Sequence, residues 1–200
     1  MSATEGAIYV VRHGETVWNA EGRRQGRMDS PLTARGVEQA RAVGRALRKA
    51  LRDARGVVLE SSPLGRARAT AEIVCRELGL AQSAIVPQPL LAELHNGDWQ
   101  GLTAAEIDAR FPGARDARDR EKWSYTFPGG ESYADAYRRA TAWLSARKHA
   151  SDTIAVTHEM LSRTLLGAYA GCTSDEMLAL SHPHDRIYCL RGGRITEAAA

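Results

Sequence analysis

Short apolar runs alternate with longer stretches of helical periodicity over most of the chain. Four runs have the length and composition of buried strands: 7–11, 57–60, 84–86 and 153–156. Apolar side chains three or four positions apart predict helices over 33–51, 64–78, 103–110, 132–149 and 161–169. A last short run at 187–190, followed by two glycines, indicates an edge strand. This alternation predicts an α/β fold, a three-layer α/β/α sandwich around a largely parallel, mixed sheet.

No linker, repeat or shift of composition divides the chain, so we expect one domain over residues 1–200. A hydrophobic content of 44% is enough for one sizeable core. The segment 111–130 is rich in charge, proline and glycine. It is therefore predicted to be an irregular loop that covers the substrate. Its candidate contacts, each with the alternative of a solvated position, are Arg115, Arg118, Arg120, Lys122, Trp123 and Tyr125.

Charge and composition restrict the expected partners. The 27 basic residues exceed the 24 acidic ones too slightly to predict a nucleic-acid surface. No apolar run approaches the roughly 20 residues of a membrane-spanning helix, and residues 1–6 do not resemble a secretory signal. We therefore expect a cytoplasmic protein that binds neither nucleic acid nor a membrane. The odd number and wide spacing of Cys75, Cys172 and Cys189 argue against disulfides and favour small core residues.

Polar groups follow three of the predicted strands where each strand ends. Arg12 and His13 come directly after the first strand, and a polar turn leads from the second strand to Arg66. His158 follows the strand at 153–156. Because the carboxyl ends of parallel strands meet at one edge of a sheet, we expect these side chains to converge. The pattern predicts a cationic pocket built from residues that are far apart in sequence.

These groups belong to an ordered set of motifs that spans almost the whole chain. In chain order the motifs are Arg12-His13-Gly14-Glu15-Thr16 with Asn19, Gln25-Gly26, Asp29-Ser30-Pro31-Leu32-Thr33, Ser61-Ser62-Pro63-Leu64-Gly65-Arg66-Ala67, Glu93 with Gly97 and Gly101, Gly129-Gly130-Glu131-Ser132, and Val156-Thr157-His158. The set resembles the histidine phosphatase superfamily. An isolated Arg-His-Gly triplet arises by chance, whereas the complete set in this order is specific. The resemblance implies a phosphoglycerate mutase-like fold and phosphoryl-transfer chemistry without a cofactor.

A phosphoryl group carries negative charge on its equatorial oxygens, so its transfer depends mainly on positioning and charge neutralisation. Arg12 and Arg66 offer planar, forked donors for those oxygens, and His158 adds a donor if it is protonated. The neutral nitrogen of His13 is expected to attack phosphorus, giving a phosphohistidine that water hydrolyses. The resemblance assigns the general acid to Glu93, because a partly desolvated carboxyl near a phosphate has a raised pKa.

Further phosphate contacts are implied by the resemblance at Asn19, Gln25 and Gly26. Asn19 has an alternative reading as a local turn residue. Glu15 and Thr16 either orient the preceding Arg-His pair or cap the loop, and the sequence does not separate these two roles.

Glu159 departs from the pattern, because many relatives have glycine directly after the second histidine. Its backbone amide can still contact phosphate. Its side chain, however, would crowd the pocket or favour a less anionic or positively decorated substrate.

No metal site is predicted, because the arginines supply the charge neutralisation. His182, His184 and Asp185 are interpreted as a polar loop around Pro183 rather than as metal ligands. Seven other arginines are expected to face solvent: Arg23, Arg24, Arg27, Arg35, Arg41, Arg45 and Arg48.

Several activities are compatible with the resemblance: hydrolysis of a small phosphorylated metabolite, phosphoglycerate mutase activity and dephosphorylation of protein phosphohistidine. The mutases carry a longer segment before the Gly-Gly-Glu-Ser motif, so the short interval 111–128 favours hydrolysis. Glu93 and its glycines disfavour the protein-directed members. A non-catalytic phospholigand-binding module is the alternative outside the enzymes, against which the intact His13–Glu93 pair argues. We predict a metal-independent phosphatase acting on a small-molecule phosphoester, and expect a homodimer.

Overall fold

The computed structural model describes residues 6–51, 53–147 and 151–200. Its centre is a six-stranded sheet with the order β3-β2-β4-β1-β5-β6. The strands are β1 (Ile8–Arg12), β2 (Val58–Ser61), β3 (Ile85–Pro87), β4 (Thr153–Thr157), β5 (Arg186–Arg191) and β6 (Arg194–Ala199). The first four pair in parallel, whereas β5 is antiparallel to β1 and β6 is antiparallel to β5. The predicted mixed, largely parallel sheet is confirmed.

The prediction that the run 187–190 is an edge strand is wrong. β5 lies inside the sheet, between β1 and β6, and β6 forms the edge. Gly192 and Gly193 have φ angles of +55° and +74°, which allow the chain to reverse directly after β5. β6 escaped prediction because it is mostly exposed and lacks the apolar alternation that reveals a half-buried strand.

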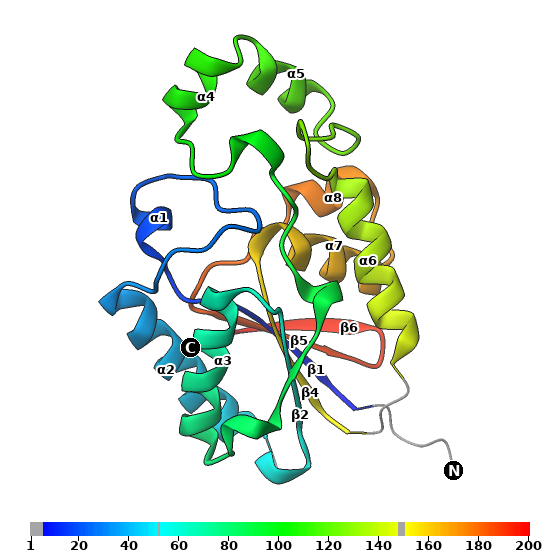
Figure 1. Cartoon of the computed structure of the whole chain (residues 1–200). Helices are drawn as coiled ribbons and strands as arrows, with labels where there is room; N and C mark the ends of the chain where they lie inside the picture. Colours follow the sequence, from blue (N-terminus) through cyan, green and yellow to red (C-terminus); the bar gives the residue numbers. More distant parts are fainter. Residues whose placement is uncertain (1–5, 52, 148–150) are drawn as a thin grey trace.

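Helices cover both faces of the sheet. They are α1 (Val17–Ala20), α2 (Ala34–Ala50), α3 (Gly65–Leu78), α4 (Ala104–Arg110), α5 (Ala114–Arg120), α6 (Tyr133–Ala146), α7 (Glu159–Ala170) and α8 (Ser174–Ala179). Figure 1 shows α2 and α3 on one side of the sheet, with α6 and α7 on the other. Alternate side chains of β1 divide accordingly: Tyr9 and Val11 pack in the core under α2 and α3, and Ile8 and Val10 in the opposite core. The three-layer α/β/α sandwich is confirmed.

The helix boundaries follow the local capping chemistry. Thr33, Thr103 and Ser132 each accept a backbone hydrogen bond at the start of α2, α4 and α6. Gly79 ends α3 in the left-handed conformation, with φ of +72°. The helix predicted over 132–149 corresponds to α6, which ends at Ala146. Residues 148–150 lie outside the described part of the chain.

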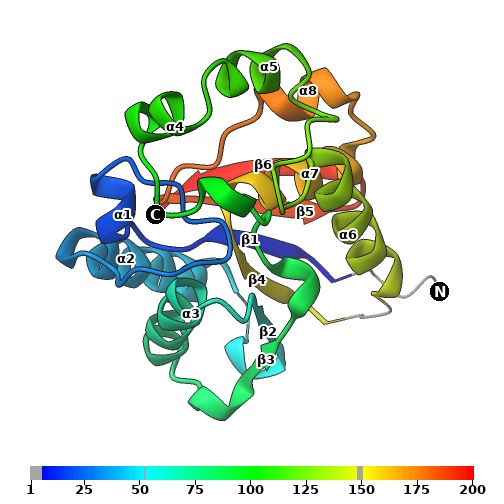
Figure 2. The ribbon, with the colours of Figure 1, turned by 45° about the horizontal axis from the view of Figure 1, so that its top comes forward.

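The segment 111–130 is not irregular throughout, because it contains α5. The sequence of this helix, Ala-Arg-Asp-Ala-Arg-Asp-Arg, offers no apolar stripe, so its periodicity gives no signal. Gly113, with φ of +76°, sets the turn that separates α5 from α4. Figures 1 and 2 show both helices in an outer layer of their own, beyond α1 and α7.

Within the described residues, no helix is both long and apolar enough to cross a membrane. All three cysteines are free. Cys75 is buried in the core as predicted, whereas Cys172 and Cys189 are only partly buried, so the core assignment holds for Cys75 alone.

Candidate active site

His13 lies just beyond the end of β1 and is 3% exposed. Its Nδ1 is 2.8 Å from the carbonyl oxygen of Gly14. Because a carbonyl only accepts, Nδ1 carries the proton and Nε2 is the unprotonated nitrogen, which accepts a hydrogen bond from Arg66 Nε. Burial, followed by the charges of Arg66 and Arg12, holds the pKa of His13 well below its usual value. His13 is therefore neutral at pH 7, with its unprotonated nitrogen at Nε2.

Arg66 lies against this nitrogen, since its Nε is 3.2 Å from His13 Nε2. The side chain enters from the first turn of α3 and is buried. Its Nη1 donates to Asp29 at 2.7 Å and to the Met28 carbonyl at 2.8 Å, and its Nη2 donates to the Gly26 carbonyl at 2.7 Å. These contacts hold the guanidinium beside His13 Nε2, at the strand ends where the sequence predicted a cation.

Arg12 completes a pair of arginines around His13. Its Nη1 donates to the His182 carbonyl at 2.8 Å and lies 3.0 Å from Glu159 Oε2. Its buried Nε has no hydrogen-bond partner among the described residues. A donor with no partner in a buried position is well suited to a phosphoryl oxygen.

Residues 182–185 form a loop, as predicted, but its two histidines are not free in solvent. His182 is buried, and the ring of His184 lies 5.4 Å from that of His13. His184 Nδ1 is 2.6 Å from the His13 carbonyl oxygen. Burial lowers the pKa of His182 to about 3 and that of His184 to about 4. The segment packs against Arg12 and His13 without lining the cavity, a contact that sequence spacing does not reveal.

His158 is the N-cap residue of α7, and its ring lies 5.1 Å from that of His13. Its Nε2 is 2.8 Å from Ser62 Oγ, while its buried Nδ1 has no partner among the described residues. Burial and the charges of Arg66 and His13 hold its pKa well below the usual value. The neutral ring can still donate from Nδ1 if Nε2 accepts from the Ser62 hydroxyl, so protonation is not required.

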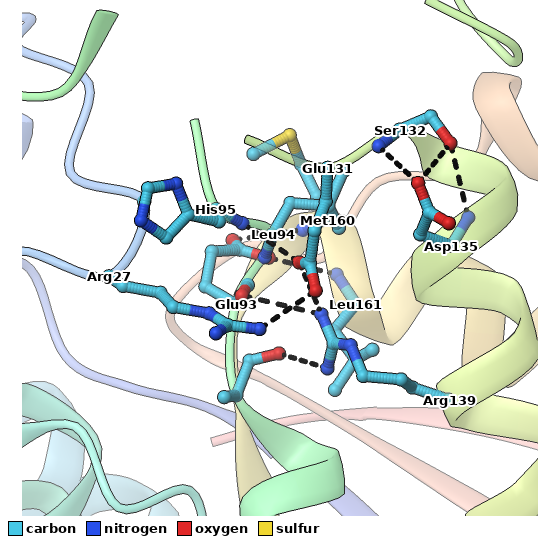
Figure 3. Close-up of polar contacts among 12 residues, drawn as sticks. Arg27, Glu93, Leu94, His95, Glu131, Ser132, Asp135, Arg139, Met160 and Leu161 are labelled. Atoms are coloured by element: carbon cyan, nitrogen blue, oxygen red, sulfur yellow. Dashed lines mark hydrogen bonds and ion pairs between the residues drawn. The ribbon is translucent and has the colours of Figure 1, made fainter. Parts of the chain in front are cut away.

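Glu93 is a buried carboxyl at 6% exposure, not a solvated loop residue. Its Oε1 accepts from the amides of Leu94 at 3.0 Å and Leu161 at 3.1 Å, and its Oε2 from that of Met160 at 3.2 Å (Figure 3). Two of these donors belong to the first turn of α7. Burial raises its pKa, although the amides and Arg66 oppose the rise. Such a carboxyl can carry a proton at a higher pH than an exposed glutamate.

An ionic network beside Glu93 holds the segment that carries it. Arg139, from α6, donates to the carbonyls of Leu90 at 3.1 Å and Ala92 at 2.8 Å. Glu131 accepts from Arg139 at 3.0 Å, from Arg27 at 2.8 Å and from the His95 amide at 2.9 Å (Figure 3). The Glu131 of the Gly-Gly-Glu-Ser motif thus joins α6 to the irregular segment that carries Glu93.

A cavity of about 250 Å³ opens onto His13. Its lining contains the predicted contact residues Asn19, Gln25, Gly26 and Glu159. Asn19 also completes the capping box of α1, accepting from the Thr16 hydroxyl at 2.9 Å through Oδ1. Its local turn role is confirmed, and its phosphate contact stays a prediction. Six arginines line the cavity: Arg12, Arg23, Arg24, Arg66, Arg118 and Arg163. Ligand cavities are usually larger, so this one favours a small anion-bearing molecule.

Two of the arginines assigned to solvent, Arg23 and Arg24, line this cavity. Arg24 lies 5.6 Å above the ring of Trp99, and burial together with the charge of Arg118 lowers its pKa to about 10. The other five arginines of that group are exposed as predicted.

Of the two roles considered for Glu15 and Thr16, the observed contacts support capping. Glu15 accepts from Thr33 at 2.9 Å, and Thr16 caps α1.

The sequence reasoning missed Asn96, Tyr133 and Arg163, which also line the cavity. One feature of the sequence could have pointed to Arg163. It stands four residues after Glu159 on α7, where an acidic and a basic side chain meet on one helix face. Among the described residues, no group of three or more histidine, cysteine or carboxylate side chains is arranged to hold a metal ion.

A family model described as the histidine phosphatase superfamily (branch 1) matches residues 8–195. The chain belongs to this superfamily. It is 38% identical over 136 residues to a 2,3-bisphosphoglycerate-dependent phosphoglycerate mutase of Methylobacterium radiotolerans, a match that covers 68% of this chain and 63% of that mutase. It is 35% identical over 194 residues to a probable phosphoglycerate mutase of Salmonella paratyphi B, with 95% of this chain and 83% of the relative covered.

The solved structures that resemble this chain include phosphatases. The structure of a mycobacterial glucosyl-3-phosphoglycerate phosphatase superposes with a TM-score of 0.78 at 29% identity, covering 98% of this chain and 97% of the other. The phosphoglycerate mutase-like fold is therefore established, whereas its relatives carry two different activities.

Proposed function

We propose that the protein is a metal-independent phosphatase that hydrolyses a small phosphorylated metabolite through a phosphohistidine at His13. The observation that carries the proposal is the neutral Nε2 of His13, held beside Arg66 within a cavity that also reaches Glu93. Arg12, Arg66 and the unpartnered Nδ1 of His158 are the groups that neutralise or bind the phosphoryl oxygens.

In the first step, His13 Nε2 attacks phosphorus and the bond from phosphorus to the ester oxygen breaks. Glu93 protonates that oxygen as it leaves, which its raised pKa favours. In the second step, the Glu93 carboxylate takes a proton from water as the water oxygen attacks the phosphohistidine. Inorganic phosphate leaves, and neutral His13 and protonated Glu93 are regenerated.

Hydrolysis is favoured over the mutase reaction by the short segment between Phe111 and Pro128. A mutase must retain its phosphohistidine until the second acceptor oxygen is in place. The mutase names of the two curated relatives keep that reaction as the second candidate.

The test is phosphate release from a panel of phosphomonoesters in a buffer containing a metal chelator, for the native protein and for His13→Ala. Release by the native protein alone supports the proposal. Interconversion of 2- and 3-phosphoglycerate in the presence of 2,3-bisphosphoglycerate, without phosphate release, would establish the mutase instead. Equal release by both proteins would contradict the role of His13.

A further inference from the structure

Glu159 is a carboxylate inside the anion-binding cavity. Of the described residues that line the cavity, only Glu93 and Glu159 are acidic. Glu93 is buried and bound to three amides, whereas the Glu159 side chain is 31% exposed and contacts arginines. Its Oε2 lies 3.0 Å from Arg12 Nη1, and its Oε1 accepts from Nη2 of Arg163. Glu159 therefore bridges two cations of the cavity.

This bridge uses an arginine that the proposed reaction needs. Arg12 Nη1 is already bound to the His182 carbonyl, so Glu159 adds a second acceptor to the same nitrogen. A phosphoryl group that approaches Arg12 meets a carboxylate of like charge beside the same guanidinium. Because like charges a few ångströms apart repel strongly in a partly desolvated site, the two anions compete for Arg12.

A second set of cations is available to the displaced carboxylate. Burial and then the charge of Arg118 lower the pKa of Arg24. Burial and then the charges of Arg118 and Arg163 lower the pKa of Lys122, so these cations lie near one another. The buried Nε atoms of Arg118 and Arg163 have no hydrogen-bond partner among the described residues. The acidic partner of Arg118 is Asp119, whose side chain is 60% exposed. The ion pair between Arg163 and Glu159 can therefore persist when Arg12 binds a phosphoryl group instead of Glu159.

We propose that Glu159 is an internal competitor for phosphate. It neutralises Arg12 in the empty site and retains only Arg163 when a phosphoryl group is bound. In this way it weakens the binding of inorganic phosphate, the product of the proposed reaction. The inference rests on the proposed function only in treating Arg12 as a phosphate ligand.

The test is calorimetric titration of the native protein and of Glu159→Gln with inorganic phosphate at pH 7.5. We expect Glu159→Gln to bind phosphate about tenfold more tightly, because one like charge next to the anion is gone. Glu38→Gln is the matched control. It removes an exposed carboxylate that pairs with Arg41 on α2, away from the cavity, and should leave the affinity unchanged.

Unchanged or weaker phosphate binding by Glu159→Gln would overturn the proposal and would show that Glu159 only orients Arg12. Glu159→Ala provides a second variant if Glu159→Gln unfolds at a lower temperature than the native protein. The titration needs no turnover, so tighter binding in a protein that hydrolyses no phosphoester would refute the proposed function alone. Where hydrolysis occurs, the inhibition constant of phosphate should fall in parallel with the dissociation constant.

Discussion

Arg139→Met tests whether the ionic network of α6 positions the proposed acid. Arg139 donates to the carbonyls of Leu90, Ala92 and Glu93, and it pairs with Glu131 at 3.0 Å. Methionine keeps most of the aliphatic stem and removes all of these donors. The carbonyls on both sides of the Glu93 side chain then lose their fixed partner.

The expected loss of stability follows from the burial of these groups. The side chains of Arg139 and Glu131 are 17% and 22% exposed, so water replaces part of what the guanidinium supplies. Hydrogen bonds to a charged group contribute about 1.5–3 kcal/mol each when buried. With partial rehydration we expect a decrease of about 3 kcal/mol in the free energy of unfolding. In urea this corresponds to a midpoint lower by roughly 1 M.

If Arg139→Met displaces the proposed acid, the loss of activity should depend on whether the leaving group needs a proton. Alkyl phosphates need a proton on the leaving oxygen, whereas the 4-nitrophenolate ion departs without one. We expect Arg139→Met to lower kcat/KM for an alkyl phosphate at least tenfold more than kcat/KM for 4-nitrophenyl phosphate, because kcat/KM reports the first step alone. Arg138→Met is the matched control, because that arginine is 74% exposed and pairs only with Asp135 among the described residues. Equal losses on both substrates would refute the positioning role.

Three further predictions follow from the same site and its supports. Glu93→Gln should lower kcat/KM for alkyl phosphates by about 10²–10⁴ while 4-nitrophenyl phosphate is affected far less; a uniform loss would argue against an acid role. The pKa of His184, about 4 in the folded protein, lies below that of the unfolded chain, so the unfolded state binds more protons below pH 6.5. The free energy of unfolding should therefore fall as the pH is lowered from 7 to 5, by about 2 kcal/mol for this histidine. In urea titrations at the two pH values, His184→Gln should show a decrease that is smaller by that amount. Gly97→Ala should cost about 3 kcal/mol, since φ is +50° and a Cβ would lie 1.8 Å from the Pro128 carbonyl oxygen. Gly79→Ala, with φ of +72° and open space, should cost about 1 kcal/mol in the same urea titration.

The central strands and the residues at their ends could be predicted from the sequence. β1 and β4 are continuous apolar runs with an abrupt polar end, so His13 and His158 were placed at one edge of the sheet by topology alone. Glu93 lies in no regular element, and only its place among the ordered motifs pointed to it.

The far side of the cavity could not be predicted, because its residues are brought together by tertiary packing. Arg118 was one of six candidate contacts in the covering segment, and it is the one that lines the cavity. Arg24 lies in a loop that gives no burial signal. His184 and His13 are in contact although they are 171 residues apart in the sequence. The periodicity of apolar residues gives no information about contacts over such a separation. A positive side chain in such places looks like any solvated arginine until the fold is known.

The central claim is that His13 becomes phosphorylated during turnover. The direct measurement is a rapid quench into alkali of the native protein with a ³²P-labelled substrate from the panel, followed by mapping of the label, since phosphohistidine survives alkali. We predict acid-labile label on the peptide that contains His13, with none on His13→Ala and more on Glu93→Gln with 4-nitrophenyl phosphate, where the second step lacks its base. Turnover of the labelled substrate without any label on His13 would contradict the account.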